Sequence, residues 1–102
     1  MKKSSVVVIT YDGPDTAEFS EWMDGPHYEE VRNTPGIVSA KRFRVTNGPA
    51  GHRRYLAILE SEDIDATIAW RDSPQGQHSQ AEANSRGVTN RYSVVCELLH
   101  SV

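Results

Sequence analysis

The sequence predicts a single α+β domain over residues 1–102, with a four-stranded antiparallel sheet and two helices on one face of that sheet. Two observations predict this class. Segments with strand and helix patterns follow one another in the order β-α-β-β-α-β, and no internal repeat or linker divides the chain. In this order, right-handed crossovers place both helices on the same face of the sheet.

The first strand and the first helix are separated by turn residues. Residues 6–11 form a β-branched run that Asp12-Gly13-Pro14 ends, as expected of a strand. Asp15 precedes Glu18 by three residues, the spacing of a capping box, so we expect the helix to begin here.

A proline interrupts this helix before it ends at Thr34-Pro35-Gly36. Proline lacks an amide donor and its ring clashes with the preceding turn. We therefore expect a kink at Pro26, or a second short helix with Pro26 in its first turn. Residues 37–45 and 54–60 then form a hairpin, with turn chemistry at residues 47–51.

The second helix should begin after Asp63, which is a suitable N-cap residue. Ser73-Pro74-Gln75-Gly76 should break it, and the polar residues 77–84 should be helical again. Residues 91–99 complete the sheet as a fourth strand, which gives a ferredoxin-like topology.

Three of the strands carry apolar side chains on both faces, in the runs 6–9, 55–59 and 94–96. Two short helices can cover only one face of the sheet, and monomers rarely leave a large apolar patch exposed. We therefore expect a two-fold homodimer that packs sheet against sheet. The alternative is that Leu98, Leu99 and the tail fold back over that face.

Composition excludes several classes of partner. The chain has 14 acidic and 11 basic residues and no long basic stripe, so nucleic acid is not expected to bind. No apolar run approaches the roughly 20 residues of a membrane span. Cys96, the single cysteine, is expected to be a small core residue in a reducing compartment, which predicts a cytoplasmic protein.

Three short motifs resemble a known superfamily. They are Trp22-x-x-x-Pro26-His27, Pro35-Gly36-Ile37-x-x-x-Lys41-Arg42-Phe43 and Arg54-Tyr55-Leu56. This pattern resembles the dimeric α+β barrel proteins, and among them the EthD-like proteins. The resemblance implies a ligand cavity between the sheet and its two helices. It also implies one of several activities, which include cofactor-free monooxygenases, polyketide cyclases, muconolactone-type isomerases and dehalogenases.

His27 is the first candidate for catalysis. It falls at the edge of the apolar stripe of its helix and should face the sheet. If Pro26 begins a new helical segment, the helix dipole would keep the imidazole neutral and usable as a general base. The alternative is a core histidine. Glu30 could orient His27 or pair with Arg42 or Arg44, or it could simply face solvent.

Arg42 and His78 are the other catalytic candidates. A guanidinium at Arg42 would suit a carboxylate or enolate oxygen, although a surface salt bridge is the more common role of such an arginine. The resemblance makes His78, in the second-helix region, a further acid-base candidate, although its polar neighbours are typical of a plain surface position. No third ligand accompanies His27 and Glu30, so we predict no metal site.

Aromatic residues on the strands and helices could line a substrate pocket, although residues at these spacings also suit the core. These candidates are Tyr11, Trp22, Tyr28, Tyr55, Trp70 and Tyr92.

The function predicted from these features is a small cofactor-independent lyase, isomerase or cyclase. It would carry out acid-base chemistry on an oxygenated, aromatic or unsaturated small molecule. The alternatives are a cofactor-free monooxygenase of phenols and a small-ligand-binding protein without turnover.

Overall fold

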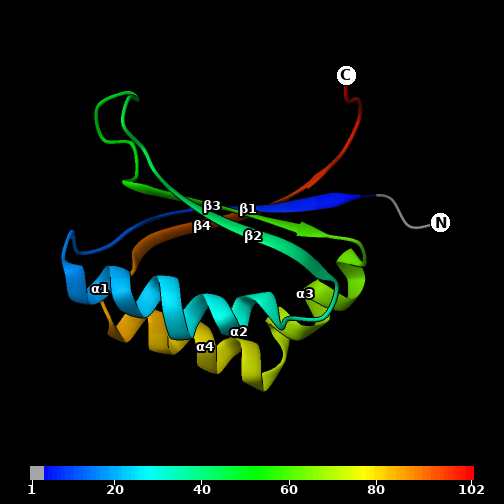
Figure 1. Cartoon of the computed structure of the whole chain (residues 1–102), viewed down its shortest axis with the longest axis horizontal. Coiled ribbons are helices and arrows are strands. Elements are labelled where there is room, and N and C mark those ends of the chain that lie inside the picture. Colours follow the sequence, from blue (N-terminus) through cyan, green and yellow to red (C-terminus); the bar gives the residue numbers. More distant parts are fainter. Residues whose placement is uncertain (1–3) are drawn as a thin grey trace.

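A four-stranded antiparallel sheet is the centre of the computed structural model, which describes residues 4–102. Its strands are β1 (Ser5–Asp12), β2 (Ile37–Arg44), β3 (Tyr55–Ser61) and β4 (Thr89–Glu97), in the spatial order β2-β3-β1-β4. All the helices lie on one side of this sheet (Figure 1). The predicted α+β class and ferredoxin-like topology are therefore confirmed.

The register of β1 decides which side chains meet the helices. Val7 lies opposite Leu59 of β3 and Val95 of β4, while Val8 lies opposite Ile58 and Val94. Successive side chains on a strand point to opposite faces. Val7 and Tyr11 consequently face the helices and are buried, whereas Val8 lies on the other face.

The first helical run joins α1 (Ala17–Trp22), η1 (Met23–His27) and α2 (Tyr28–Arg32). The predicted start at Asp15 was wrong, because the N-cap is Thr16, whose hydroxyl accepts a hydrogen bond from the Phe19 amide at 3.2 Å. The interruption expected at Pro26 takes the form of the π-helical turn η1. A wider turn accommodates a ring that has no amide hydrogen to donate.

The second helical run joins α3 (Ile64–Asp72) and α4 (Pro74–Ser85). Asp63 caps α3 as predicted, since its carboxylate accepts from the Ala66 amide at 3.2 Å. The break is shorter than expected. Ser73 alone separates the helices, and its hydroxyl caps α4 by accepting from the Gly76 amide at 3.2 Å. Pro74 fits the first turn of α4, where its missing amide donor costs nothing.

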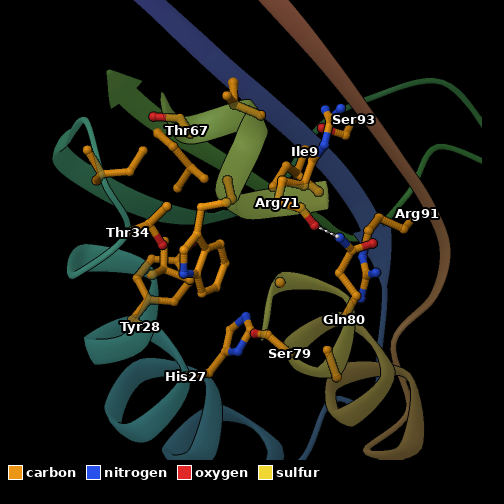
Figure 2. A pocket seen from close by; sticks show the side chains of 18 of the residues that line it. Ile9, His27, Tyr28, Thr34, Thr67, Arg71, Ser79, Gln80, Arg91 and Ser93 are labelled. Carbon is orange, nitrogen blue, oxygen red and sulfur yellow. Dashed lines mark hydrogen bonds between the residues drawn. The ribbon is translucent and has the colours of Figure 1, made fainter. Parts of the chain in front are cut away.

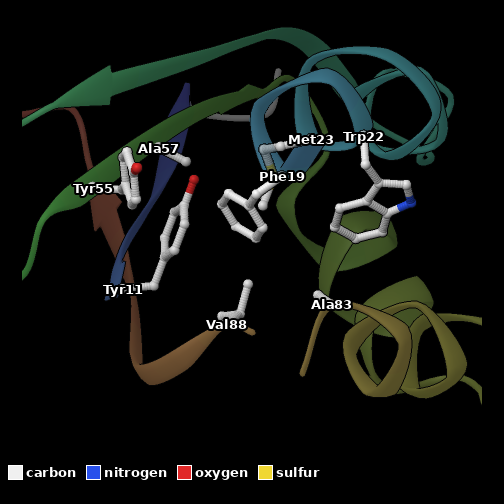
Figure 3. Close-up of a cluster of buried hydrophobic side chains, with 8 residues drawn as sticks. All are labelled: Tyr11, Phe19, Trp22, Met23, Tyr55, Ala57, Ala83 and Val88. Atoms are coloured by element: carbon white, nitrogen blue, oxygen red, sulfur yellow. The ribbon is translucent and has the colours of Figure 1, made fainter. Parts of the chain in front are cut away.

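A cluster of buried side chains holds the helices against the sheet (Figure 3). The Tyr11 and Tyr55 rings stack with their centroids 5.4 Å apart, and the Tyr55 hydroxyl donates to the Pro14 carbonyl at 3.3 Å. The remaining members come from the helices, β3 and the segment that leads into β4. They are Phe19, Trp22, Met23, Ala57, Ala83 and Val88.

The opposite face of the sheet is not covered. Phe43, Tyr92 and Val94 have exposed fractions of 44%, 59% and 54% there. The C-terminal segment rises away from the sheet on this side (Figure 1), so the alternative in which the tail folds back over the face was wrong. Cys96 is exposed on β4, so the expectation of a core cysteine was wrong for the single chain.

Candidate functional site

A cavity of about 160 Å³ lies between the sheet and the helices. Its floor comes from β1 and β3, and its walls come from η1, α2, α3, α4 and the start of β4. An apolar cavity of about 150 Å³ accepts a molecule the size of benzene. The space therefore suits a ligand built on one ring, and it lies where the superfamily resemblance implies a ligand cavity.

His27 ends the π-helical turn and its side chain points into the cavity (Figure 2). The imidazole stacks on the Trp22 indole with ring centroids 4.7 Å apart. Burial lowers the pKa of His27 below its usual 6.5, and the charge of Arg91 adds to this effect, while the carboxylates of Glu30 and Glu82 oppose it. The imidazole is consequently neutral near pH 7.

The cause of this neutrality differs from the predicted one. His27 lies in the middle of a helical run that continues from Ala17 to Arg32, so it does not occupy the positive end of a helix. Desolvation between the helices and the sheet is the main cause instead.

Two tyrosines bring phenol groups to the cavity. The Tyr28 hydroxyl donates to the Lys41 carbonyl at 3.4 Å, and burial raises the pKa of this phenol. Tyr11 is 4% exposed, and its hydroxyl has no hydrogen-bond partner within residues 4–102. Burial raises the pKa of Tyr11 by more than the nearby Arg42 guanidinium lowers it. A buried hydroxyl without a partner is costly, and the oxygen atom of a ligand could reach it only if the side chains that cover it moved.

The helices α3 and α4 supply the opposite wall. Trp70 contributes its aromatic ring to the lining. The side chains of Ser79 and His27 point toward one another across the cavity (Figure 2). Ser79, Gly76 and Ala83 are small and buried residues of α4, and they leave room for a ligand.

Two arginines that the sequence analysis did not select also line the cavity. Arg71, Gln80, Val88, Arg91 and Ser93 border both the cavity and an adjoining surface groove, and we call this opening the cavity mouth. The alternation of side chains between the two faces of β4 could have identified Arg91 and Ser93, because both lie on the same face of the strand as Val95, which is the face toward the helices.

Four of the predicted site residues meet at the cavity, namely His27, Tyr11, Tyr28 and Trp70. Arg42 does not. Its Nε and Nη2 atoms donate to the two carboxylate oxygens of Asp24 at 2.7 and 3.0 Å, and its guanidinium lies 5.3 Å from the centroid of the Tyr55 ring. This arrangement corresponds to the salt bridge that was the alternative interpretation of Arg42.

The other predicted residues lie elsewhere. Glu30 and His78 are exposed and do not border the cavity, as their alternative interpretations expected. Trp22 and Tyr55 belong to the core cluster. Tyr92 lies on the uncovered face of the sheet, where the Arg53 guanidinium is 3.9 Å from the centre of its ring.

Two further features of residues 4–102 bear on binding. No three His, Cys, Asp or Glu side chains in this range gather closely enough to hold a metal ion. Within the same range, no helix has the length and apolar character needed to cross a membrane.

The fold and the cavity define a class of protein: a small ferredoxin-like α+β domain with a ring-sized cavity between sheet and helices. No protein-family model and no curated protein sequence matches the chain. The structure is similar to an EthD family protein from Bacillus halodurans, with 18% identity and a TM-score of 0.68 over 94% of this chain and 99% of the other.

Two enzymes of known activity share the fold. SnoaB from Streptomyces nogalater, a cofactor-independent oxygenase, is 13% identical with a TM-score of 0.76 over 98% of this chain and 97% of the other. A hydroxynitrile lyase from Passiflora edulis is 6% identical with a TM-score of 0.76 over 100% of this chain and 99% of the other. Other similar structures are described as dimeric ferredoxin-like proteins of unknown function. At these identities the similarity establishes the fold of the EthD-like proteins and not the reaction.

Proposed function

We propose that the protein is a small enzyme that transfers a proton within an oxygenated aromatic or unsaturated substrate, without a cofactor. One observation carries this proposal: a half-buried His27 with a lowered pKa faces an apolar cavity that also holds two phenols. A neutral imidazole near pH 7 is a competent general base. A lyase, isomerase or cyclase would use this step.

The reaction would begin when His27 accepts a proton from a carbon next to a carbonyl group. The electron pair of the broken C–H bond would move to the carbonyl oxygen and form an enolate. The Tyr11 hydroxyl lacks a partner within the described chain, and it would donate a hydrogen bond to that oxygen once the substrate displaced the side chains that cover it. The imidazolium would then return its proton at another atom, and Trp70 would position the ring of the substrate.

Proton exchange with solvent tests this proposal without knowledge of the natural substrate. A panel of ring-sized ketones and phenols would be incubated with the enzyme in D₂O, and NMR would follow loss of the proton signal α to the carbonyl or ortho to the phenol hydroxyl. We expect His27→Gln to slow catalysed exchange by roughly 10²- to 10⁴-fold, the range for a lost general base. His78→Gln is the matched control, because His78 is exposed and outside the cavity. A folded His27→Gln variant that exchanges at the normal rate would remove His27 from the mechanism.

A second candidate function is a cofactor-free monooxygenase. The similarity in fold to the cofactor-independent oxygenase supports it, and so does a base able to deprotonate a phenol. Oxygen uptake with phenolic substrates, measured by an oxygen electrode, distinguishes it from the lyase-type reaction. Binding of ring compounds with neither exchange nor oxygen uptake would favour a ligand-binding protein without turnover.

We also propose that a second copy of the chain covers the exposed sheet face and forms a homodimer. The hairpin loop at residues 45–54 and the C-terminal segment rise on either side of this face (Figure 1). Apolar residues such as Phe43 and Val94 lie exposed on it, and burial of such a patch favours association. A cytoplasmic location is also our proposal, because a single cysteine with no second cysteine to form a disulfide suits a reducing compartment.

Sedimentation measures this association directly. We expect the wild-type chain to sediment as a dimer and Val94→Lys to sediment as a monomer, since a lysine would be buried without a partner. Ala81→Lys is the control, because Ala81 is exposed on α4 among the helices. A stable single-copy particle at high micromolar concentration would contradict the dimer.

A further inference from the structure

We propose that the substrate of the cavity is an organic anion, a ring or unsaturated chain with a carboxylate group that Arg91 binds at the cavity mouth. This inference rests on the proposed function in one respect, because it names the substrate class of the same site. It adds a specificity-determining residue that the sequence analysis did not select.

The charges around the cavity favour an anion. Its lining residues include Arg71, Arg91 and His27, and they include no Asp or Glu. Glu30 and Glu82 are close enough to act on His27, but both are exposed outside the cavity. Fixed positive charge in a partly desolvated site attracts an anionic ligand more strongly than the same charge does in water.

Arg91 is the better placed of the two arginines. It is partly buried at the start of β4, and it forms no ion pair with another residue in the range 4–102. Burial lowers the pKa of its guanidinium, which shows that the charge has lost part of its solvation. A carboxylate would restore that stabilisation through two parallel N–H···O bonds, the geometry that a guanidinium favours.

Arg71 is already engaged. Its Nε atom donates to the carboxylate of the adjacent Asp72 at 3.0 Å, and its carbonyl accepts from the Gln80 side chain at 3.5 Å. The Asp72 carboxylate, which borders the adjoining groove, offsets the charge of Arg71, while Arg91 remains available for direct contact.

The positions of the two ends of the cavity define how such a molecule would lie. His27 and Tyr28 line one side, and Arg71, Gln80 and Arg91 lie together on another side (Figure 2). A carboxylate at Arg91 would direct the ring of the ligand past Trp70 toward His27. The proton to be removed would then belong to the part of the molecule farthest from the carboxylate.

Benzoate and benzamide are suitable probes, because they share a size and a ring and differ in charge. Their affinities would be measured by NMR shift titration of the ¹⁵N-labelled full chain. We expect benzoate to bind at least roughly 10-fold more tightly than benzamide, the lower end of the range for a charge-assisted hydrogen bond. Arg91→Gln should remove this preference and leave benzamide affinity unchanged. Arg32→Gln, which removes an exposed charge from α2, should preserve it.

The outcomes separate this inference from the proposed function. Equal affinity for the two probes, no binding of benzoate at millimolar concentration, or a preference that survives Arg91→Gln would each overturn the inference. None of these results involves turnover. Conversely, His27→Gln should keep the preference for benzoate, so a failure of the exchange assay would overturn the acid-base proposal and leave the anion site intact.

Discussion

Removal of the Tyr11 hydroxyl should stabilise the protein, which is unusual for a substitution in a core. Tyr11 is 4% exposed and its hydroxyl has no hydrogen-bond partner in residues 4–102. The Nε and Nη2 atoms of the neighbouring Arg42 are directed to Asp24. An unsatisfied buried polar group costs about 1–3 kcal/mol, so Tyr11→Phe should raise the free energy of unfolding by about that amount. Each kcal/mol corresponds to a rise in Tm of roughly 4–8 °C for a domain of this size.

Tyr55 provides a matched control with the opposite sign. Its ring stacks on Tyr11 (Figure 3), but its hydroxyl donates to the Pro14 carbonyl at 3.3 Å. Tyr55→Phe should therefore lower the free energy of unfolding by about 0.5–1.5 kcal/mol. Urea unfolding at one fixed protein concentration measures both variants, because dimerisation makes stability depend on concentration. Destabilisation by Tyr11→Phe would refute the reasoning, since it would mean that the Tyr11 hydroxyl is satisfied in the folded protein.

Two further predictions concern His27 and the turn between α3 and α4. The folded-state pKa of His27 is lowered below its unfolded value of about 6.5. At pH values below 6.5 the unfolded chain therefore binds more protons than the folded chain, and stability falls as the pH falls toward the folded pKa. Urea midpoints measured across this range should fall less in His27→Gln than in the wild type, and identical pH profiles would contradict the burial of His27. A Cβ atom at Gly76 would lie 2.3 Å from the Trp70 carbonyl oxygen, so Gly76→Ala should destabilise the protein by about 1–3 kcal/mol. A Cβ atom at Gly25 would meet no atom within 4 Å, so Gly25→Ala should be neutral or slightly stabilising in thermal unfolding. Equal effects at both glycines would show that the turn between α3 and α4 is not tightly packed.

Local patterns were sufficient to predict the sheet and its topology. The β-branched runs, the Asp63 cap and the Pro35-Gly36 turn each follow from short-range sterics and hydrogen bonding, which a sequence displays directly. Gly36 has a φ of +86°, and its Cβ would approach the Asp63 carbonyl oxygen to 2.5 Å, so this turn requires glycine. Errors in the predicted secondary structure were confined to boundaries, where adjacent capping residues such as Asp15 and Thr16 compete.

The candidate site was less predictable, because its members come from segments far apart in the chain. His27 could be selected from its place on the helix, but the neutrality of its imidazole follows from burial by tertiary packing. Arg42 shares the inward face of β2, yet the pairing with Asp24 across the first helical run could not be inferred from spacing. Arg91 was missed because the prediction for β4 rested on the apolar run that follows it, residues 94–96.

The second helical run shows why a cavity wall is hard to recognise in a sequence. Methods based on hydrophobic periodicity detect bulky apolar side chains, because these are the residues that fill a core. The buried face of α4 carries Gly76, Ser79 and Ala83 instead, and their short side chains fill little of the space above the sheet. The space they leave becomes the cavity, so a polar helix with small residues at helical spacing is the signal to seek. The same small residues let His27 and Arg91 border one space, and the charge of Arg91 helps to keep His27 neutral. A carboxylate bound to Arg91 would offset that charge and raise the pKa of His27, so binding of an anionic substrate would itself make the imidazole a stronger base.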